Sequence, residues 1–296
     1  MEEISIEQFF VPSTILQNGA LDALRVLGDS PIEQAEPYYY KHAFSLLCRA
    51  PIAASKSFLA RYSCGLSATK LLPAFMRYEK KRVEVKAVTE NKSNDNSTPK
   101  AVKSAFSRNN DVELSIDAHG SFKSFVDDST ASVTYFEGAI TLGCRSPAVY
   151  NYLVSLYVNF DDETPLFDFI SKHVSTGATL PGMQPKQSSP LDMNYALSTI
   201  LQSGRHFRSA IKLYMGFGMR FRAVELAIKV DPVIAKQLAA ECVERDEKKR
   251  LWSMIARNAA IEGESSGGKE VVSKVLSVLN ECGPGVLSIE DVLPFL

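Results

Sequence analysis

The sequence predicts an all-α protein, an α-solenoid of stacked antiparallel helical hairpins, and three observations favour this class. Apolar residues recur along most of the chain at spacings of three and four, which places them on one face of a helix. The connections between these periodic segments are short, so consecutive helices must fold back on each other. The alternation of apolar and polar residues that marks a strand is scarce outside Val112–Ile116.

The composition is that of a folded protein with no dominant charge. The chain has 296 residues, 45% hydrophobic and 23% charged, and its net charge is -1. This balance argues against binding to nucleic acid or anionic lipid through charge alone, although a local patch stays open. The acidic N-terminus and the lack of a run of about 18 apolar residues argue against a signal peptide and membrane insertion. Five scattered cysteines without a CxxC pair favour a reducing cytosolic compartment over a disulfide framework or zinc module.

Residues 1–83 are expected to form the N-terminal part of the solenoid. Three apolar faces support this, made by Ala43, Leu46 and Leu47, by Phe58, Leu59 and Tyr62, and by Leu71, Leu72, Phe75 and Met76. Pro51 and Pro73 are expected in the first turns of helices, where a missing N–H costs nothing. The basic run Lys80–Arg82 is expected to end a helix, because positive charge complements a helix C-terminus.

Two polar segments interrupt the pattern. Residues 84–131 are predicted to be a disordered insert, since their centre, Asn91–Lys100, has no apolar residue to offset the entropy of ordering. Solenoid helices are expected to resume over residues 132–174. A loop rich in proline and serine is then expected over residues 175–191.

Residues 192–296 are predicted to form the C-terminal part of the solenoid, where the helical spacing of apolar residues is clearest. The predicted core faces are Leu197, Ile200 and Leu201; Ala210, Leu213, Tyr214 and Phe217; Phe221, Val224, Ala227 and Ile228; Leu251, Trp252, Ile255 and Ala259; and Val271, Val275, Leu276 and Leu279. Gly204 and Gly218 suit left-handed positions at helix ends. Asp231-Pro232 predicts a helix start, and Ser288–Asp291 predicts a capping-box variant.

A faint internal repeat supports the stacking. Gly204–Leu213 aligns with Gly218–Ala227 at a step of one helix plus one turn. A hairpin of two such units cannot bury its apolar face alone, and stacking solves this problem. A chance likeness between two amphipathic helices is the alternative.

No catalytic, cofactor or metal site is predicted. Gly263–Lys269 resembles a phosphate loop, but Glu270 stands where Ser or Thr would hold magnesium, and a helix rather than a strand precedes it. None of the four histidines has another His or Cys at metal-ligand spacing; they are His42, His119, His173 and His206. A flexible loop between helices is therefore expected at Gly263.

Basic residues offer the candidate interaction surfaces. Arg205, Arg208, Arg220 and Arg222 gather around consecutive turns and form a candidate protein-interaction surface. The runs Lys80–Arg82 and Lys248–Arg250 are expected to be solvated helix faces, with docking to an acidic partner as the alternative.

Several segments, taken in order, resemble known families. Tyr195–Asp231 resembles a clathrin-heavy-chain-type helical repeat. Five segments resemble the vacuolar protein sorting-associated protein eighteen (Deep orange) family: Leu72–Glu79, Pro147–Tyr157, Ala235–Gln237, Asp246–Arg257 and Ile289–Phe295.

This resemblance implies a scaffold, the class C core subunit of the HOPS and CORVET tethering complexes, which hold endosomal and lysosomal or vacuolar membranes together before SNARE-driven fusion. The implied partners are the other class C core subunits, including the SNARE-binding SM-type subunit, and indirectly Rab GTPases and SNAREs. The implied location is cytoplasmic, peripheral on the cytosolic face of late endosome, lysosome or vacuole membranes. The family also has an N-terminal β-propeller and a zinc-binding RING finger; the chain begins within the solenoid and ends at Leu296 before any RING cysteines, so no zinc or ubiquitin-ligase activity is expected of it.

Three alternatives remain at the level of sequence. Another coat or adaptor solenoid, such as clathrin heavy chain, predicts the same fold with different partners. An all-helical nucleotide hydrolase would use the loop at Gly263. A peptide-binding protein of the tetratricopeptide type is disfavoured, because its consensus and its steady period do not occur.

Overall fold

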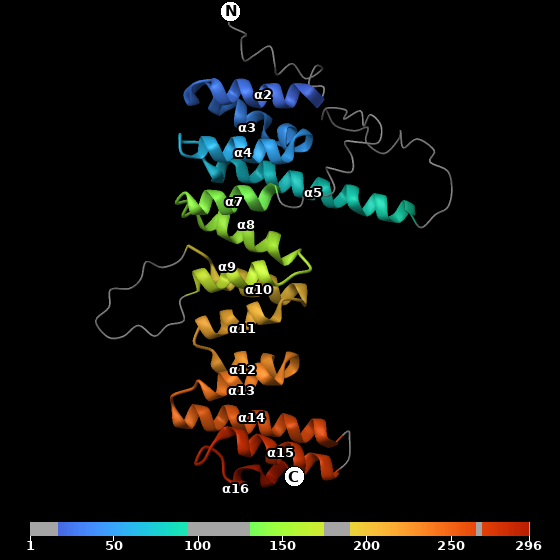
Figure 1. The fold of residues 1–296 in the computed structure, drawn as a ribbon, viewed down its shortest axis with the longest axis vertical. Helices are drawn as coiled ribbons and strands as arrows, with labels where there is room; N and C mark the ends of the chain where they lie inside the picture. The colour runs from blue at the N-terminus through green and yellow to red at the C-terminus, as the bar shows by residue number, and fades with distance from the viewer. Residues whose placement is uncertain (1–16, 94–130, 175–189, 265–267, 296) are drawn as a thin grey trace, which may run out of the picture. The chain divides into compact units, whose positions relative to one another are not determined.

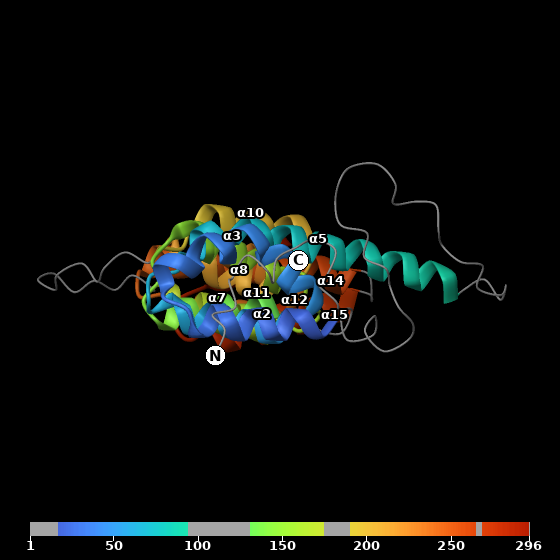
Figure 2. The same ribbon diagram turned by 90° about the horizontal axis from the view of Figure 1, so that it is seen from above.

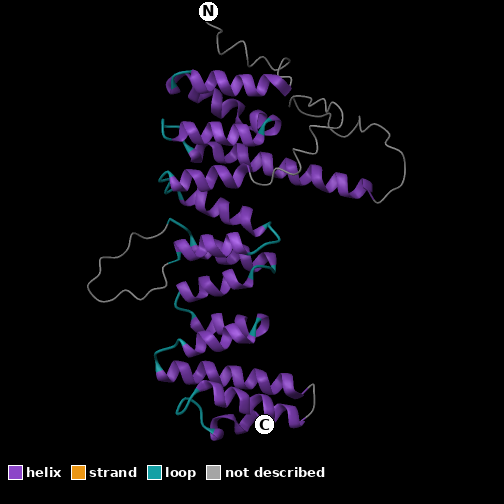
Figure 3. Cartoon of the chain, viewed as in Figure 1, coloured by secondary structure: helices purple, strands orange, loops and turns teal. Residues whose placement is uncertain are grey.

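The computed structural model describes residues 17–93, 131–174, 190–264 and 268–295. Within these ranges the chain forms fourteen α-helices and one 310-helix, without a strand (Figure 3). The predicted all-α class is therefore confirmed, while Val112–Ile116 and the centre of the predicted insert lie outside the described residues. The chain divides into two compact units, Met1–Val149 and Tyr150–Leu296, and each is taken by itself.

The first unit is a stack of helices in which contacts join neighbours in the chain and also helices that have another helix between them in the sequence (Figure 1). Helix α3 packs on α2, α4 and α5, and α7 packs on α4 and α5. The helices of this unit are α2 (Gln17–Asp29), α3 (Ile32–Arg49), α4 (Pro51–Tyr62), α5 (Ala68–Ser93) and α7 (Ala131–Thr141).

Five aromatic rings from four helices form the centre of the first unit. Their side chains are fully buried and belong to Tyr39, Phe58, Phe75, Tyr135 and Phe136. Phe58 meets Tyr39 edge-on at a centroid distance of 5.6 Å, and Phe75 stacks on Tyr135 at 4.8 Å. Such pairs add specific geometry to the burial of large apolar area, so they fix how the four helices pack.

Helix α5 departs from the prediction in two ways. It does not end at Arg82 but continues to Ser93, into the segment assigned to the insert, and α7 begins at Ala131, one residue before the predicted boundary. Figures 1 and 2 both show its C-terminal part extending past the other helices of the unit. A helix satisfies its own backbone hydrogen bonds, so Lys, Glu and Ala residues can continue it without burial.

Pro73 also lies elsewhere than predicted, since it falls inside α5 rather than in its first turn. The carbonyl group that loses its helical donor belongs to Thr69, which is exposed, so water can replace the missing bond. Pro51 does occupy the first position of α4, as predicted.

The second unit, in contrast, is stacked mostly in chain order. Contacts join α10 to α11, α11 to α12, α12 to α13, α13 to α14 and α14 to α15, and α9 also packs on α11. Its helices are α9 (Thr164–His173), α10 (Met193–Ser203), α11 (Phe207–Gly216), α12 (Arg220–Val230), α13 (Pro232–Ala240), α14 (Arg245–Glu264), α15 (Gly268–Cys282) and α16 (Ile289–Val292), followed by the 310-helix Leu293–Phe295; α8 (Pro147–Val158) begins in the first unit and continues into the second.

The predicted helix boundaries of this unit are confirmed. Gly204 and Gly218 have φ of 65° and 73°, the left-handed region that favours glycine. The side chain of Asp231 accepts the backbone N–H of Val233 at 2.9 Å, and Pro232 follows it as the first helical residue. The backbone N–H of Ser288 donates to Oδ2 of Asp291 at 2.9 Å, which completes the predicted capping box.

The internal repeat corresponds to equivalent structural positions. Gly204 and Gly218 both precede a helix in the left-handed conformation, and the burial pattern after them matches. Each of the aligned pairs Ser209 and Ala223, Ala210 and Val224, and Leu213 and Ala227 is fully buried. The match is incomplete, because Phe207 is half-buried whereas the aligned Phe221 is 52% exposed, so the repeat stays a prediction.

Four residues of the predicted apolar faces are exposed instead: Met76 in the first unit, at 50%, and three residues in the second. Leu201, Phe221 and Leu276 keep 40%, 52% and 48% of their surface accessible. Each lies at the rim of its apolar stripe, and the described residues place no neighbouring helix over that rim. Periodicity finds the apolar stripe of a helix, but the position of the next helix decides how much of it is buried.

Candidate interaction surface

The predicted arginine surface is divided between two places in the second unit. Arg205 lies in the turn before α11 and forms an ion pair with Asp161, Nη1 to Oδ1 at 3.1 Å. Next to it, Nε2 of His206 is 3.2 Å from the carbonyl oxygen of Val158. The backbone N–H of Ser209 donates to Oε1 of Glu163 at 2.7 Å. These contacts join the turn between α8 and α9 to the start of α11, so Arg205 serves the fold locally.

Arg220 and Arg222 lie at the other end of α11, at the start of α12. Arg220 pairs with Glu247 of α14, Nη1 to Oε2 at 2.9 Å, and Arg222 pairs with Glu225 on its own helix at 2.9 Å. A ten-residue helix separates the two places by about 15 Å. Arg208 is exposed and forms no ion pair within the described ranges, so it is the member of the set with a cation left for a partner.

A small polar cluster surrounds Arg220. The Sγ of Cys242 lies 3.2 Å from Oε2 of Glu247. The pKa of Glu247 is lowered by its hydrogen bond from the Cys242 thiol and then by Arg220. The pKa of Cys242 is raised by burial and by the same carboxylate. A thiol that stays protonated is a poor nucleophile, and the ion pair of Arg220 with Glu247 joins α12 to α14.

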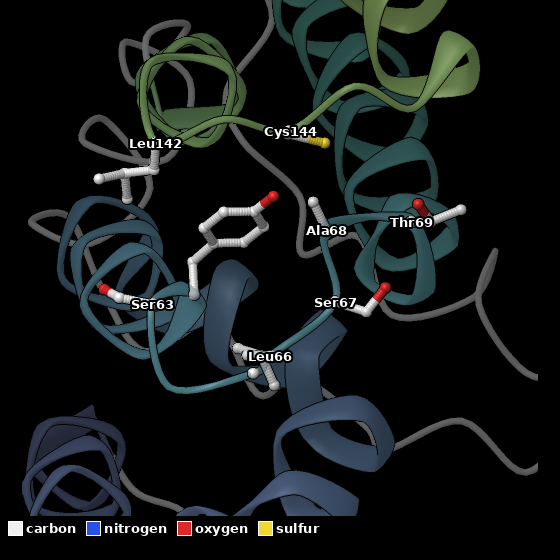
Figure 4. A pocket seen from close by; sticks show the side chains of 9 residues that line it. Ser63, Leu66, Ser67, Ala68, Thr69, Leu142 and Cys144 are labelled. Atoms are coloured by element: carbon white, nitrogen blue, oxygen red, sulfur yellow. The ribbon is translucent and has the colours of Figure 1, made fainter.

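A shallow hollow in the first unit lies between the connection from α4 to α5 and the end of α7. Figure 4 shows Leu142 and Cys144 on one side and Ser67, Ala68 and Thr69 on the other. Burial, followed by the neighbouring Cys144, raises the pKa of Tyr62 to about 12, so its phenol stays protonated at neutral pH. The lining residues offer hydroxyls and a thiol, and no carboxylate or imidazole is among them.

The segment that resembles a phosphate loop lies between two packed helices. Gly263 is in the last turn of α14, and a Cβ placed there would lie 2.6 Å from Cα of Val271 on α15. This glycine is therefore required by the close approach of two helices. The predicted loop at Gly263 is wrong at both of its ends, because Gly263 belongs to α14 and Gly268–Glu270 belong to α15; residues 265–267 between them lie outside the described residues.

The two basic runs differ in how far the fold uses them. In the run Lys248–Arg250, Lys249 forms an ion pair with Asp291 at 2.9 Å and Lys248 donates to the carbonyl oxygen of Ala240 at 3.1 Å. Two of its three cations thus hold α14 to neighbouring segments. The prediction that this run is only a solvated helix face is therefore incomplete, because Lys248 and Lys249 also form contacts within the fold.

The run Lys80–Arg82 lies on the middle of α5 rather than at its end. Arg82 pairs with Glu79, Nε to Oε2 at 2.9 Å, and Glu79 also accepts the hydroxyl of Ser132 at 2.5 Å. Lys81 instead lies over the ring of Phe44 on α3, with Nζ 5.5 Å from the ring centroid. Phe44 was not among the predicted residues, although its position one residue after the apolar Ala43 puts it at the edge of the α3 core face.

Among the described residues no group of three or more His, Cys, Asp or Glu side chains could hold a metal ion. His119 lies outside them. A search of the same residues for a helix long and apolar enough to cross a membrane finds no such helix.

Comparison with known proteins identifies one family. Residues 99–260 match the family model described as VPS18, alpha-solenoid domain, second half. Vacuolar sorting protein 18 of Arabidopsis thaliana is 32% identical over 156 residues, which is 51% of this chain. The matched part spans only 15% of the length of that relative. The α-solenoid predicted from periodicity and stacking is thus the domain type that the family model names.

Proposed function

Since the chain belongs to the VPS18 family, we propose that it supplies the α-solenoid of a scaffold subunit in a tethering complex of endosomal and lysosomal or vacuolar membranes. The observation that carries this proposal is the family match over residues 99–260. The family is one of structural solenoid subunits concerned with vacuolar sorting. The role in tethering is the step that goes beyond family membership.

The proposed mechanism is mechanical. In each unit the helices bury their apolar faces against neighbouring helices and leave their outer faces to solvent. Solenoids of this kind offer long lateral surfaces on which other subunits dock, through a few buried anchors surrounded by polar contacts. No group in the chain is assigned a chemical step.

The proposed partners are the other class C core subunits of HOPS and CORVET, including the SNARE-binding SM-type subunit, with Rab GTPases and SNAREs reached through them. The proposed location is the cytosolic face of late endosome, lysosome or vacuole membranes, where the protein is held by these partners. The near-zero net charge supports recruitment by proteins over direct attraction to anionic lipid.

Affinity purification of the tagged chain from cells, followed by mass spectrometry, tests the proposal. We expect the SM-type subunit and other class C core subunits to co-elute. The matched control is a clathrin-heavy-chain solenoid fragment of similar length, which should not bring them down. Recovery of coat components instead of tethering subunits would contradict the proposal and favour the alternative of a coat solenoid.

The nucleotide-hydrolase alternative has its own test. The position of Gly263 against the backbone of Val271 disfavours a loop that wraps a phosphate. We expect no nucleotide binding by calorimetry. Binding of ATP or GTP that is lost on Lys269→Ala would contradict the proposed scaffold role.

A further inference from the structure

Helices α3 and α5 present two cations held over one aromatic ring. Cζ of Arg77 lies 4.6 Å and Nζ of Lys81 lies 5.5 Å from the centroid of the Phe44 ring. Arg77 and Lys81 are one turn apart on α5, and Phe44 is half-buried on α3. Cation–π attraction restricts both side chains, so they are already ordered before any partner arrives.

Three cations near this ring have no carboxylate partner among the described residues. Lys80 and Lys81 form no ion pair within the described part of the chain, and neither does Arg49 near the end of α3. Burial lowers the pKa of Arg49, as expected for a cation that lacks a carboxylate partner. Among the nearest acidic groups, Glu79 is bonded to Arg82 and Ser132, whereas Glu84 is exposed one turn farther along α5. A net positive charge therefore remains on this side of α5.

Apolar side chains lie beside the cations. Met76 and Val83 are 50% and 60% exposed, and they are two turns apart on the same stripe of α5. On the helical wheel Lys80 falls between this stripe and Arg77. Two exposed apolar residues at a spacing of two turns are typical of positions that receive the anchors of an amphipathic segment.

We propose that this region, the α3–α5 surface made by Phe44, Met76, Arg77, Lys80, Lys81 and Val83, docks an acidic amphipathic segment of a partner protein. Carboxylates of the partner would pair with Lys80 and Lys81, and its apolar side chains would cover Met76 and Val83. Charge complementarity determines the acidic class, and the adjacent apolar stripe determines the amphipathic pattern. The inference deepens the proposed scaffold role by naming the kind of segment that the scaffold holds.

The same observations favour a protein over a lipid surface. A membrane-binding helix carries exposed Trp, Phe or Leu beneath mobile Lys and Arg side chains. Here the aromatic ring lies half-buried under the cations and fixes them, an arrangement suited to carboxylates at fixed positions. Anionic membranes are therefore an outcome of the test rather than the proposal.

The first experiment measures peptide binding to the full chain. The probe is a synthetic, fluorescently labelled helical peptide with glutamates on one face and leucines on the adjacent face, and its control has every glutamate replaced by glutamine. We expect the acidic peptide to bind at least about tenfold more tightly than the neutral one, and the difference to shrink as salt screens the charges.

The variants assign the binding to the surface. We expect the double variant Lys80→Glu and Lys81→Glu to lower the affinity for the acidic peptide by about tenfold or more. The double variant Met76→Ser and Val83→Ser should lower the affinity for both peptides. The matched control is Lys56→Glu combined with Lys172→Glu, two exposed lysines without an ion pair in the described residues, which changes the net charge equally. Circular dichroism verifies that each variant is folded.

Four outcomes would overturn the proposal. Equal affinity for the two peptides, or no loss in the Lys80 and Lys81 double variant, would remove the charge argument. Binding to vesicles of phosphatidylserine and phosphatidylcholine that this variant abolishes, with peptide binding unaffected, would assign the surface to a membrane. Self-association that the variant abolishes would assign it to a second copy of the chain. Since the peptide assay contains no tethering subunit, its failure is distinguishable from a failure of the affinity purification.

Discussion

Arg61 on α4 donates from Nη2 to the carbonyl oxygen of Leu27 near the end of α2, at 2.9 Å. The same nitrogen reaches the carbonyl oxygen of Ser30 at 2.8 Å and also contacts that of Gly28. The last carbonyls of a helix lack partners within the helix, so one guanidinium satisfies the C-terminus of α2 and joins it to α4.

Replacement of Arg61 should loosen this joint. We expect Arg61→Ala to lower the free energy of unfolding by about 2 kcal/mol, because charge-assisted hydrogen bonds to partly buried carbonyls are lost. Chemical denaturation gives the overall change, and hydrogen exchange should localise it to α2. Arg25→Ala, an exposed arginine on α2 without a partner among the described residues, is the control and should have little effect. An equal loss in both variants would contradict the capping role.

The aromatic centre of the first unit should be its most sensitive point. Phe58 contacts Tyr39, Phe75 and Tyr135 edge-on and is fully buried. We expect Phe58→Ala to cost about 3–5 kcal/mol, because the cavity removes contacts with three helices. Leu21→Ala, at a residue that is 55% exposed, should cost less than about 1 kcal/mol. Urea unfolding of both variants makes the comparison, and similar losses would show that the ring cluster is not central.

Gly263 and Gly28 provide a matched pair of helical glycines. A Cβ at Gly263 would lie 2.6 Å from Cα and 2.9 Å from the backbone N of Val271, atoms that cannot rotate away, whereas nothing lies within 4 Å of a Cβ at Gly28. We expect Gly263→Ala to destabilise by about 1–3 kcal/mol through overpacking of α14 against α15. Gly28→Ala should instead stabilise by about 0.5–1 kcal/mol, since alanine restricts the unfolded chain. Thermal unfolding of both proteins tests the sign, and a neutral Gly263→Ala would mean that the two helices can separate freely.

The C-terminal capping box should respond to acid. The pKa of Asp291 is lowered to about 2, first by the backbone N–H of Ser288 and then by Lys249. Because this value lies below the unfolded value of about 3.9, the stabilisation is present above pH of about 4 and is lost as the pH falls through about 2. Asp291→Asn should remove this part of the pH dependence.

The single tryptophan of the chain, Trp252, is buried in α14 and reports on this region. Urea unfolding followed by its fluorescence at a series of acid pH values measures the effect of Asp291→Asn. Parallel pH profiles for the variant and the wild type would refute the assignment.

The features that depend on a few neighbouring residues could be predicted from the sequence. Asp231 and Ser288 start helices as expected, because a cap is decided by side chains within one turn. The exposure of Leu201 and Phe221 could not be predicted, because it depends on where the next helix lies. The end of α5 was misplaced for a related reason: a basic run is compatible with a helix end but does not require one.

The candidate surfaces also depend on helix lengths and packing, which the sequence does not reveal. The four arginines are close in sequence, but α11 separates Arg205 from Arg220, and only the helix length reveals this. The contact of Arg77 and Lys81 with Phe44 joins residues far apart in the chain. It becomes visible only when α3 and α5 are known to pack together.

The order of helix contacts in the second unit has a consequence for folding kinetics. From α10 to α15 each helix packs on its successor along the chain. Each of these contacts joins residues that are close in the sequence, so its formation closes only a short loop and costs little chain entropy. Proteins with such a low contact order fold quickly. The exchange of amide hydrogens in α15 and α16 should accordingly occur through local opening, while α12 and α13 exchange only when larger parts of the unit open.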